Sequence, residues 1–165
     1  MAVDYNYFRK AIKKILNECA YPVFLVCQDE TKKCTCIDDA TNQPNTECKK
    51  CLGTGYKVTI KIIKAASQEE MKDGATISAT NSRVVRNYYV DSKYPVFENN
   101  YIIDDNKVYY VFRLERLKGL HNESSHQQIK AVLKTDKHST ILNNCLEIIN
   151  AKLPKSKRGD FPWLH

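Results

Sequence analysis

The first pattern along the chain is that of an amphipathic helix over residues 4–19. Apolar side chains recur there at helical spacing and basic ones fill the other side: Tyr5, Phe8, Ile12, Ile15, Leu16 and Cys19 against Arg9, Lys10, Lys13 and Lys14. Asp4 is placed to cap the first turn, with Val3 and Phe8 at the positions of a hydrophobic staple. Because the residue before a proline disfavours helical geometry, Pro22 predicts that the helix ends near Cys19.

Two strands are predicted on either side of a cysteine-rich loop. Residues 21–29, YPVFLVCQD, have the apolar run of a short buried strand, and residues 57–65, KVTIKIIKA, alternate branched and basic positions. Since the first strand enters the loop and the second leaves it, we expect the two to form a hairpin. The polar segment from Gln68 to Gly74 predicts a turn after the second strand.

The clearest hairpin of the sequence lies at residues 101–117, YIIDDNKVYYVFRLERL. Two β-rich runs are joined there through Asp104, Asp105 and Asn106, which are residue types that tolerate turn conformations. Asp104 and Asp105 also resemble a pair of catalytic carboxylates, but their place between two strands favours a role in the turn.

The remaining segments are shorter or less regular. Residues 76–90 predict two short strands or one interrupted strand, and residues 92–100 and 120–126 predict polar loops. Residues 127–134 alternate apolar positions with lysines, as a half-buried strand does. A final helix over residues 139–152 carries a continuous apolar side, formed by Ile141, Leu142, Cys145, Leu146, Ile148 and Ile149.

Together these elements predict a mainly β (α+β) fold, a β-barrel or sandwich-like domain with N-terminal and C-terminal helices and a small zinc-binding hairpin. The chain of 165 residues suits a single domain over residues 1–165, into which residues 34–56 are inserted as a loop. The C-terminal tail has little periodicity but holds the only tryptophan. We expect Trp163 to pack against its own domain or a neighbouring subunit.

Composition and charge limit the cellular compartment and the kinds of partner that we expect for the protein. No apolar run approaches the roughly 18 residues that cross a bilayer, and the start of the chain lacks the apolar core of a signal peptide. We therefore expect a soluble protein from a reducing compartment, without a membrane partner, in which seven cysteines do not form a disulfide framework. The net charge of +7 suits nucleic-acid contact, but the basic residues are scattered among apolar positions.

The cysteine-rich loop predicts a metal site. Cys34 and Cys36 are followed, after eleven residues, by Cys48 and Cys51. Two pairs of soft metal ligands therefore lie at the two ends of a loop of about the length of a hairpin. The segment Leu52-Gly-Thr-Gly lets the backbone turn tightly, so that amide N–H groups can point at the sulfurs. We expect these four thiolates to hold a structural Zn²⁺ with no open coordination position.

Other interpretations of the cysteines stay open. The Cys48–Cys51 pair could be redox-active, although it is followed by glycine and a strand rather than a helix. The loop could also hold plain reduced thiols, with Cys27 as a substitute ligand. Cys19 and Cys145 lie on apolar helix faces and are expected to be buried as small hydrophobic residues.

No catalytic motif is found in the sequence. Phosphate-binding glycine loops, H-E-x-x-H and G-x-S-x-G are all missing. His121 and His126 flank a polar loop and could act as ligands or bases, but isolated loop histidines are more often solvated. We expect that the protein is not an enzyme.

The segment 48–56, CKKCLGTGY, resembles the C-x-x-C-x-G-x-G knuckle of J-domain co-chaperones, which carry four such repeats and a His-Pro-Asp signature that this chain lacks. More of the chain resembles bacteriophage head-to-tail connector (neck) and tail-completion virion proteins. The similar features are an N-terminal helix, the Pro22-Val23 strand, C-x-C before C-x-x-C-x-G-T-G-Y, and a barrel hairpin at residues 96–112. Asn106 stands where that hairpin usually has glycine.

This resemblance implies a structural virion protein assembled in the host cytoplasm. Such a protein forms a ring with itself, binds neighbouring portal, neck or tail proteins, and can contact genomic DNA without sequence preference. The candidate anchors between subunits are aromatic residues, each of which could equally belong to the core: Tyr88, Tyr89, Phe161 and Trp163. The alternative is a zinc-ribbon nucleic-acid-binding or transcription accessory protein, which the basic composition favours.

Overall fold

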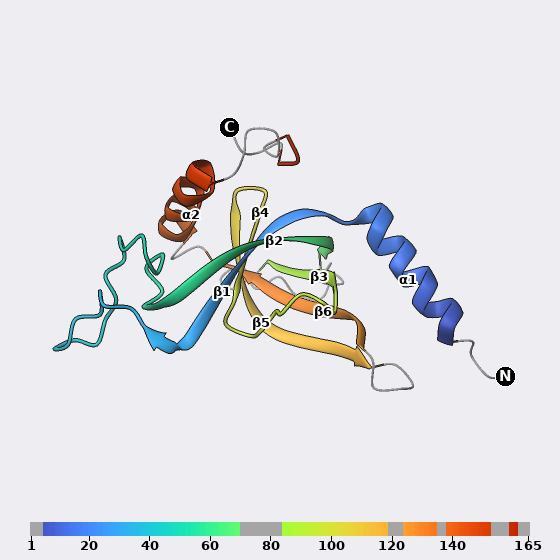
Figure 1. The fold of residues 1–165 in the computed structure, drawn as a ribbon, viewed down its shortest axis with the longest axis horizontal. Helices are drawn as coiled ribbons and strands as arrows, with labels where there is room; N and C mark the ends of the chain where they lie inside the picture. Colours follow the sequence, from blue (N-terminus) through green and yellow to red (C-terminus); the bar gives the residue numbers. More distant parts are fainter. Residues whose placement is uncertain (1–4, 70–83, 119–123, 135–137, 153–158, 162–165) are drawn as a thin grey trace, which may run out of the picture.

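The computed structural model describes residues 5–69, 84–118, 124–134, 138–152 and 159–161. These residues form two helices and six strands (Figure 1): α1 (Tyr5–Cys19), β1 (Tyr21–Lys33), β2 (Tyr56–Glu69), β3 (Val85–Asp91), β4 (Tyr101–Asp104), β5 (Lys107–Lys118), β6 (Ser124–Leu133) and α2 (His138–Lys152). Both predicted helices, the strands around the cysteine loop and the hairpin are therefore confirmed.

The strands close into an antiparallel barrel in the order β1-β2-β3-β6-β5-β4. This confirms the prediction of a mainly β fold. Of the two predicted architectures, barrel and sandwich, the described strands form the barrel. β1 closes the barrel because it pairs with β2 along most of its length and with β4 at Phe24, Leu25 and Val26. Closure leaves no free sheet edge among these six described strands.

Two apolar layers lie on the two faces of the sheet. The barrel interior contains Val23 and Leu25 of β1, whereas Phe24 and Val26 point outward into a second layer beneath α2. Because β1 is buried on both faces, its apolar residues run continuously instead of alternating. The apolar side of α2 completes the outer layer, as predicted, with Ile141, Leu142, Cys145 and Ile149 all buried.

The hairpin between β4 and β5 turns through two residues, not three. Asp105 and Asn106 have positive φ angles of 49° and 56°, which are typical of a type I′ turn. Asp104 is the last residue of β4 and only 2% exposed, so the interpretation of Asp104 as a turn residue is wrong. The chain turns one residue later because Asp104 still pairs with Lys107 across the hairpin.

Two strand ends extend further than the sequence predicts. β2 continues through Gln68 to Glu69, because both pair with β3, so the predicted turn cannot begin at Gln68. β6 begins at Ser124, which places His126 inside a strand, where it is 5% exposed. The expectation of a solvated loop histidine is thus wrong for His126, while His121 lies outside the described residues.

α1 projects from the barrel at the start of β1, on the side opposite the cysteine loop (Figure 1). Cys19 is exposed on this helix, so the prediction that it is buried is wrong. The periodicity is that of a covered helix, but α1 leaves Ile15 55% exposed and only half-buries Leu16. The capping and staple residues Asp4 and Val3 lie outside the described part of the chain.

Phe161, in the last described stretch of the chain (residues 159–161), packs on the barrel. Phe161 is buried and stacks on Phe24 with ring centroids 4.4 Å apart. Tyr88 is fully buried in the barrel interior. Phe161 and Tyr88 are therefore core residues and not exposed anchors, whereas Tyr89 is half-buried and Trp163 lies outside the described residues.

Candidate metal centre

The four predicted cysteines converge in the loop between β1 and β2. Their Sγ atoms all lie within 4.8 Å of one another, with 3.8 Å between Cys34 and Cys48 and 3.4 Å between Cys36 and Cys51. Four thiolates about 2.3 Å from a tetrahedral ion stand roughly 3.8 Å apart. Disulfide sulfurs would be about 2.05 Å apart, and these four cysteines are free. The cluster therefore has the spacing of a metal site.

The second cysteine pair sits in a tight glycine turn. Gly53 and Gly55 have positive φ angles of 76° and 83°, and a Cβ atom on Gly53 would lie 2.7 Å from the Thr46 carbonyl oxygen. The Gly53 N–H donates to the Cys48 carbonyl at 3.3 Å, and the backbone N–H groups of Gly55 and Gly53 act on the Cys51 thiol so as to lower its pKa. This is the arrangement that the Gly-Thr-Gly segment predicts, since such hydrogen bonds offset thiolate charge.

The protonation of these thiols follows from the same contacts. Burial raises the pKa of Cys51 to about 12 despite the amide donors. Burial also acts on Cys48, but amide N–H groups of Cys51 and Lys50 outweigh it and lower the pKa of the Cys48 thiol to about 7. The Cys48 thiol can thus ionise near neutral pH, whereas the raised pKa of Cys51 favours its protonated form there.

The first cysteine pair is fixed by a compact polar loop. The Cys34 N–H donates to the Gly55 carbonyl at 2.8 Å, which ties the two pairs together. Asp38 accepts hydrogen bonds from the backbone N–H groups of Ala40 and Thr41 at 2.8 and 2.9 Å. These backbone and side-chain hydrogen bonds hold the first cysteine pair in place.

Two contacts join the metal loop, residues 34–55 between β1 and β2, to the rest of the molecule. Leu52, which follows the last cysteine, is fully buried in the outer apolar layer. Lys49 forms an ion pair of 2.6 Å with Glu147 of α2. Sequence reasoning missed both contacts, because Leu52 looks like a turn residue and Glu147 lies 98 positions from Lys49.

The other cysteines lie outside this cluster. Cys27 points at the Pro95 carbonyl, 3.9 Å away, so it is not a substitute ligand. Cys145 is fully buried in the outer layer, as predicted, and its burial raises the pKa of the thiol to about 12.

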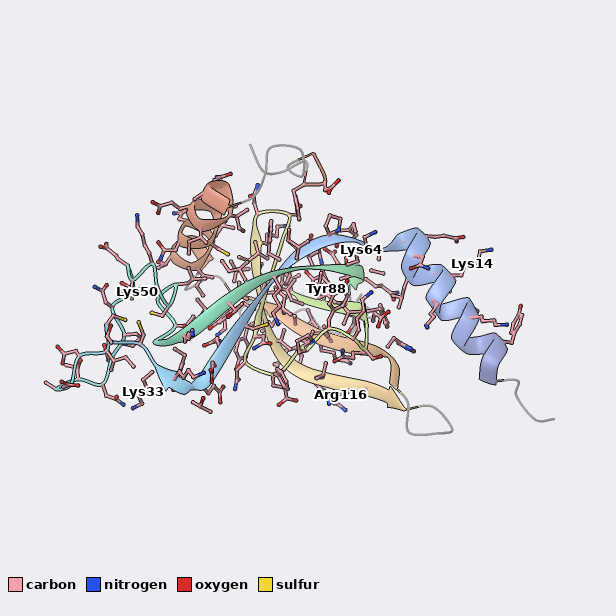
Figure 2. All side chains as sticks on the ribbon, in the orientation of Figure 1. Lys14, Lys33, Lys50, Lys64, Tyr88 and Arg116 are labelled. Carbon is pink, nitrogen blue, oxygen red and sulfur yellow. The ribbon has the colours of Figure 1, made fainter. Side chains whose placement is uncertain are left out.

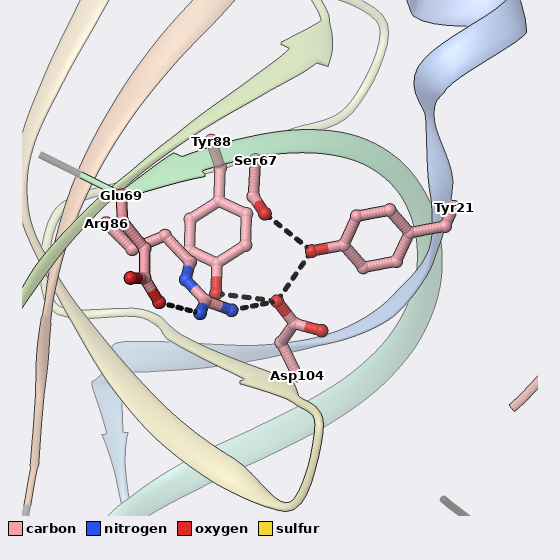
Figure 3. Close-up of polar contacts among 6 residues, drawn as sticks. All are labelled: Tyr21, Ser67, Glu69, Arg86, Tyr88 and Asp104. Atoms are coloured by element: carbon pink, nitrogen blue, oxygen red, sulfur yellow. Dashed lines mark hydrogen bonds and ion pairs between the residues drawn. The ribbon is translucent and has the colours of Figure 1, made fainter. Parts of the chain in front are cut away.

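A polar cluster that sequence reasoning missed lies inside the barrel (Figure 3). One carboxylate oxygen of Asp104 accepts hydrogen bonds from Tyr21 at 2.7 Å, Arg86 at 2.9 Å and Tyr88 at 3.1 Å. Arg86 also pairs with Glu69, and Tyr21 is 2.6 Å from Ser67. These residues come from β1, β2, β3 and β4, so the cluster ties together four strands.

The Asp104 cluster has the chemistry of a group of side chains that holds strands together. Burial raises the pKa of Tyr21 to about 12 and raises that of Tyr88 still further, so neither hydroxyl loses a proton near neutral pH. Burial lowers the pKa of the Arg86 guanidinium, but hydrogen bonds to Glu69 and Asp104, together with the nearby Tyr88 and Tyr109, outweigh it and raise that pKa, so Arg86 keeps its charge. His126, whose pKa burial lowers, belongs to a different part of the barrel wall.

A basic hollow lies beside the metal loop, between β2 and α2. Its volume is about 920 Å³, and lysines line it from three segments: Lys32, Lys33, Lys49, Lys50 and Lys57. Two of them, Lys33 at the end of β1 and Lys50 in the metal loop, are labelled at the metal-loop end of the barrel in Figure 2. Lys49 and Lys32 already pair with Glu147 and Asp29.

No protein-family model matches the chain, and the search of curated proteins finds no match to it. Within the part of the chain that the structure describes, neither helix has the length and apolarity of a transmembrane span.

Proposed function

We propose that this chain is a structural virion protein of a tailed bacteriophage, a ring-forming component of the head-to-tail neck or a tail-completion component. In this proposal Cys34, Cys36, Cys48 and Cys51 bind a structural Zn²⁺. Zinc is the preferred ion because four thiolates in a closed tetrahedral set are its typical structural site.

The observation that carries the proposal is the position of the cysteine loop in the barrel. The loop joins the first two strands of a closed barrel, and the hairpin that resembles that of neck proteins supplies strands β4 and β5. The metal loop, which a bound ion would stiffen, lies at one end of the barrel, and α1 projects at the other end (Figure 1). In this proposal both provide surfaces for contacts between subunits. The barrel interior itself is filled by apolar side chains and the Asp104 cluster.

The test of this proposal is the metal content and native mass of the purified full-length protein. We expect zinc at a ratio of one per chain and a closed, ring-sized oligomer, seen by native mass spectrometry and by negative-stain electron microscopy. Antibodies against the protein should also label the neck or tail of purified virions. A zinc-loaded chain that stays monomeric at all concentrations, and is missing from virions, would contradict this proposal.

The basic hollow favours a second candidate function, nucleic-acid binding by a zinc-ribbon-like module. Lysines from β1, β2 and the metal loop face one concave surface, where phosphates could be neutralised with release of counterions. In this alternative the metal would position Lys50 relative to Lys33, and no oligomer would be needed.

Salt dependence separates the two functions. If the hollow binds nucleic acid, Lys33→Ala with Lys50→Ala should weaken duplex binding and lower the slope of log K against log salt by about 1 for each phosphate that is no longer neutralised. The matched control is Lys64→Ala with Lys107→Ala, which removes the same charge at exposed positions outside the hollow. Fluorescence anisotropy over a salt series measures both quantities. Equal slopes for the two variants would speak against a nucleic-acid site in this hollow.

A further inference from the structure

The projecting helix α1 presents apolar and basic side chains to solvent. Ile15 is 55% exposed, Tyr7 is 76% exposed, and Cys19 is exposed on the apolar side of the helix. Lys10 and Lys14 stand beside them and are exposed as well. A helix with this mixture of side chains is typical of a segment that docks into an apolar groove with an acidic rim.

A groove with the complementary chemistry lies elsewhere on the same chain. It is open, has a volume of about 670 Å³, and is formed by the middle of β1, the loop before β4 and one residue of β5. Phe97 and Leu114 supply its apolar surface, and Phe97 is 56% exposed. Its charged lining residues are Asp29, Glu30 and Glu98, all acidic on a chain whose net charge is +7.

The groove is held in shape by hydrogen bonds around Asn99. Asn99 donates to Glu30 at 2.6 Å, and its backbone carbonyl accepts a hydrogen bond from Gln28. The Tyr110 hydroxyl also donates to the side chain of Asn99. The floor of the groove is thus preformed, which reduces the cost of binding a partner.

A chain cannot fill its own groove with its own α1. The helix leaves the barrel at Tyr21, and the groove begins at Gln28 and Asp29 on the same strand. Seven or eight residues of extended strand cover roughly 25 Å. From Tyr21 the helix runs outward, away from the barrel (Figure 1). The helix and the groove can therefore meet only between two copies.

We propose that α1 of one copy docks into the acidic groove of the next copy, with Ile15 against Phe97 and Leu114 and with Lys10 and Lys14 near Asp29 and Glu98. The two surfaces differ, so the contact is head-to-tail, and repeating it produces a ring when the rotation closes. This inference rests on the proposed ring-forming function and names the surfaces that would form the ring.

The experiment is a charge exchange in the full-length zinc-loaded protein. The helix variant carries Lys10→Glu and Lys14→Glu, and the groove variant carries Asp29→Lys and Glu98→Lys, which leaves the Asn99–Glu30 hydrogen bond in place. Each variant alone should need more than about tenfold higher protein concentration for half-assembly, since it places like charges opposite each other. Sedimentation velocity over a concentration series measures this, and circular dichroism checks that each variant is folded.

Mixing the two variants should restore assembly, because every helix then finds a groove of opposite charge in the other variant. The control, Lys64→Glu with Lys107→Glu, makes the same charge change at exposed positions off both surfaces and should assemble like the unmodified chain. Variants that assemble normally, or a mixture that stays dissociated, would overturn this contact but not a ring formed through other surfaces. An unmodified chain that never assembles would overturn both the contact and the ring.

Discussion

Replacement of Cys51 by serine is expected to abolish metal binding and to lower the melting temperature of the protein. A ligand at a thousandfold excess over its dissociation constant stabilises the folded state by about 4 kcal/mol. For a chain of this size, removing that stabilisation corresponds to a melting temperature lower by roughly 10 °C. Chelation of the metal from the unmodified protein should give a similar shift. Calorimetry and metal analysis measure the two effects.

The expected effect is large because the metal loop is attached to the core. Leu52 follows Cys51 directly and is buried in the outer apolar layer, next to the side chains of α2. When the thiolates release the ion, the turn around Gly53 is no longer fixed, and Leu52 is no longer held in that layer. Limited proteolysis of the variant should therefore cut first in the loop or at α2, while the barrel strands stay protected.

The control for this experiment is Cys27→Ser. Cys27 is a half-buried thiol on β1 that lies outside the cluster of four, so its replacement should leave the metal content unchanged. A Cys51→Ser protein with full metal content, or a chelated protein with an unchanged melting temperature, would show that the loop is not a structural metal site.

The second large effect is expected for Asp104→Asn. This change keeps the shape of the side chain but removes the negative charge that faces Arg86, whose side chain is only 13% exposed. Breaking a buried ion pair by removing one partner costs about 3 to 5 kcal/mol, because the other charge stays behind in the protein interior. Equilibrium unfolding in urea measures the decrease in the free energy of unfolding.

The neighbouring residue provides the matched control. Asp105→Asn makes the same chemical change one position later, at an exposed turn residue with a positive φ angle that asparagine also tolerates. We expect its free energy of unfolding to change by less than about 0.5 kcal/mol. If both variants were destabilised by the same amount, the Asp104 cluster would have no special role in holding the four strands together.

Most of the elements could be predicted from the sequence, because each has a local physical signature. The apolar side of α2 has helical spacing, the turn at Asp105 and Asn106 uses residues that accept positive φ angles, and the cysteine spacing matches a tetrahedral ion. In each case the signal and the structure lie within a few residues of each other.

The wrong predictions concern residues whose environment is set by distant parts of the chain. Cys19 has the periodicity of a buried residue, but burial depends on what packs against α1, and the described chain leaves that side open. Asp104 looks like a turn residue, and its partners Arg86 and Tyr21 lie 18 and 83 positions away. No local pattern of residues records such a pairing.

Local patterns in the amino-acid sequence thus specify the helices, the strands, the hairpin turn and the four clustered cysteines, since these follow from backbone preferences and ligand spacing over short stretches. Three further features emerge only in the folded chain: the strands close into a barrel, Asp104 pairs with Arg86 inside it, and Leu52 anchors the metal loop beneath α2. The reason is that barrel closure and burial are properties of contacts between segments far apart in the chain. The energy of such contacts depends on which surfaces are removed from water together.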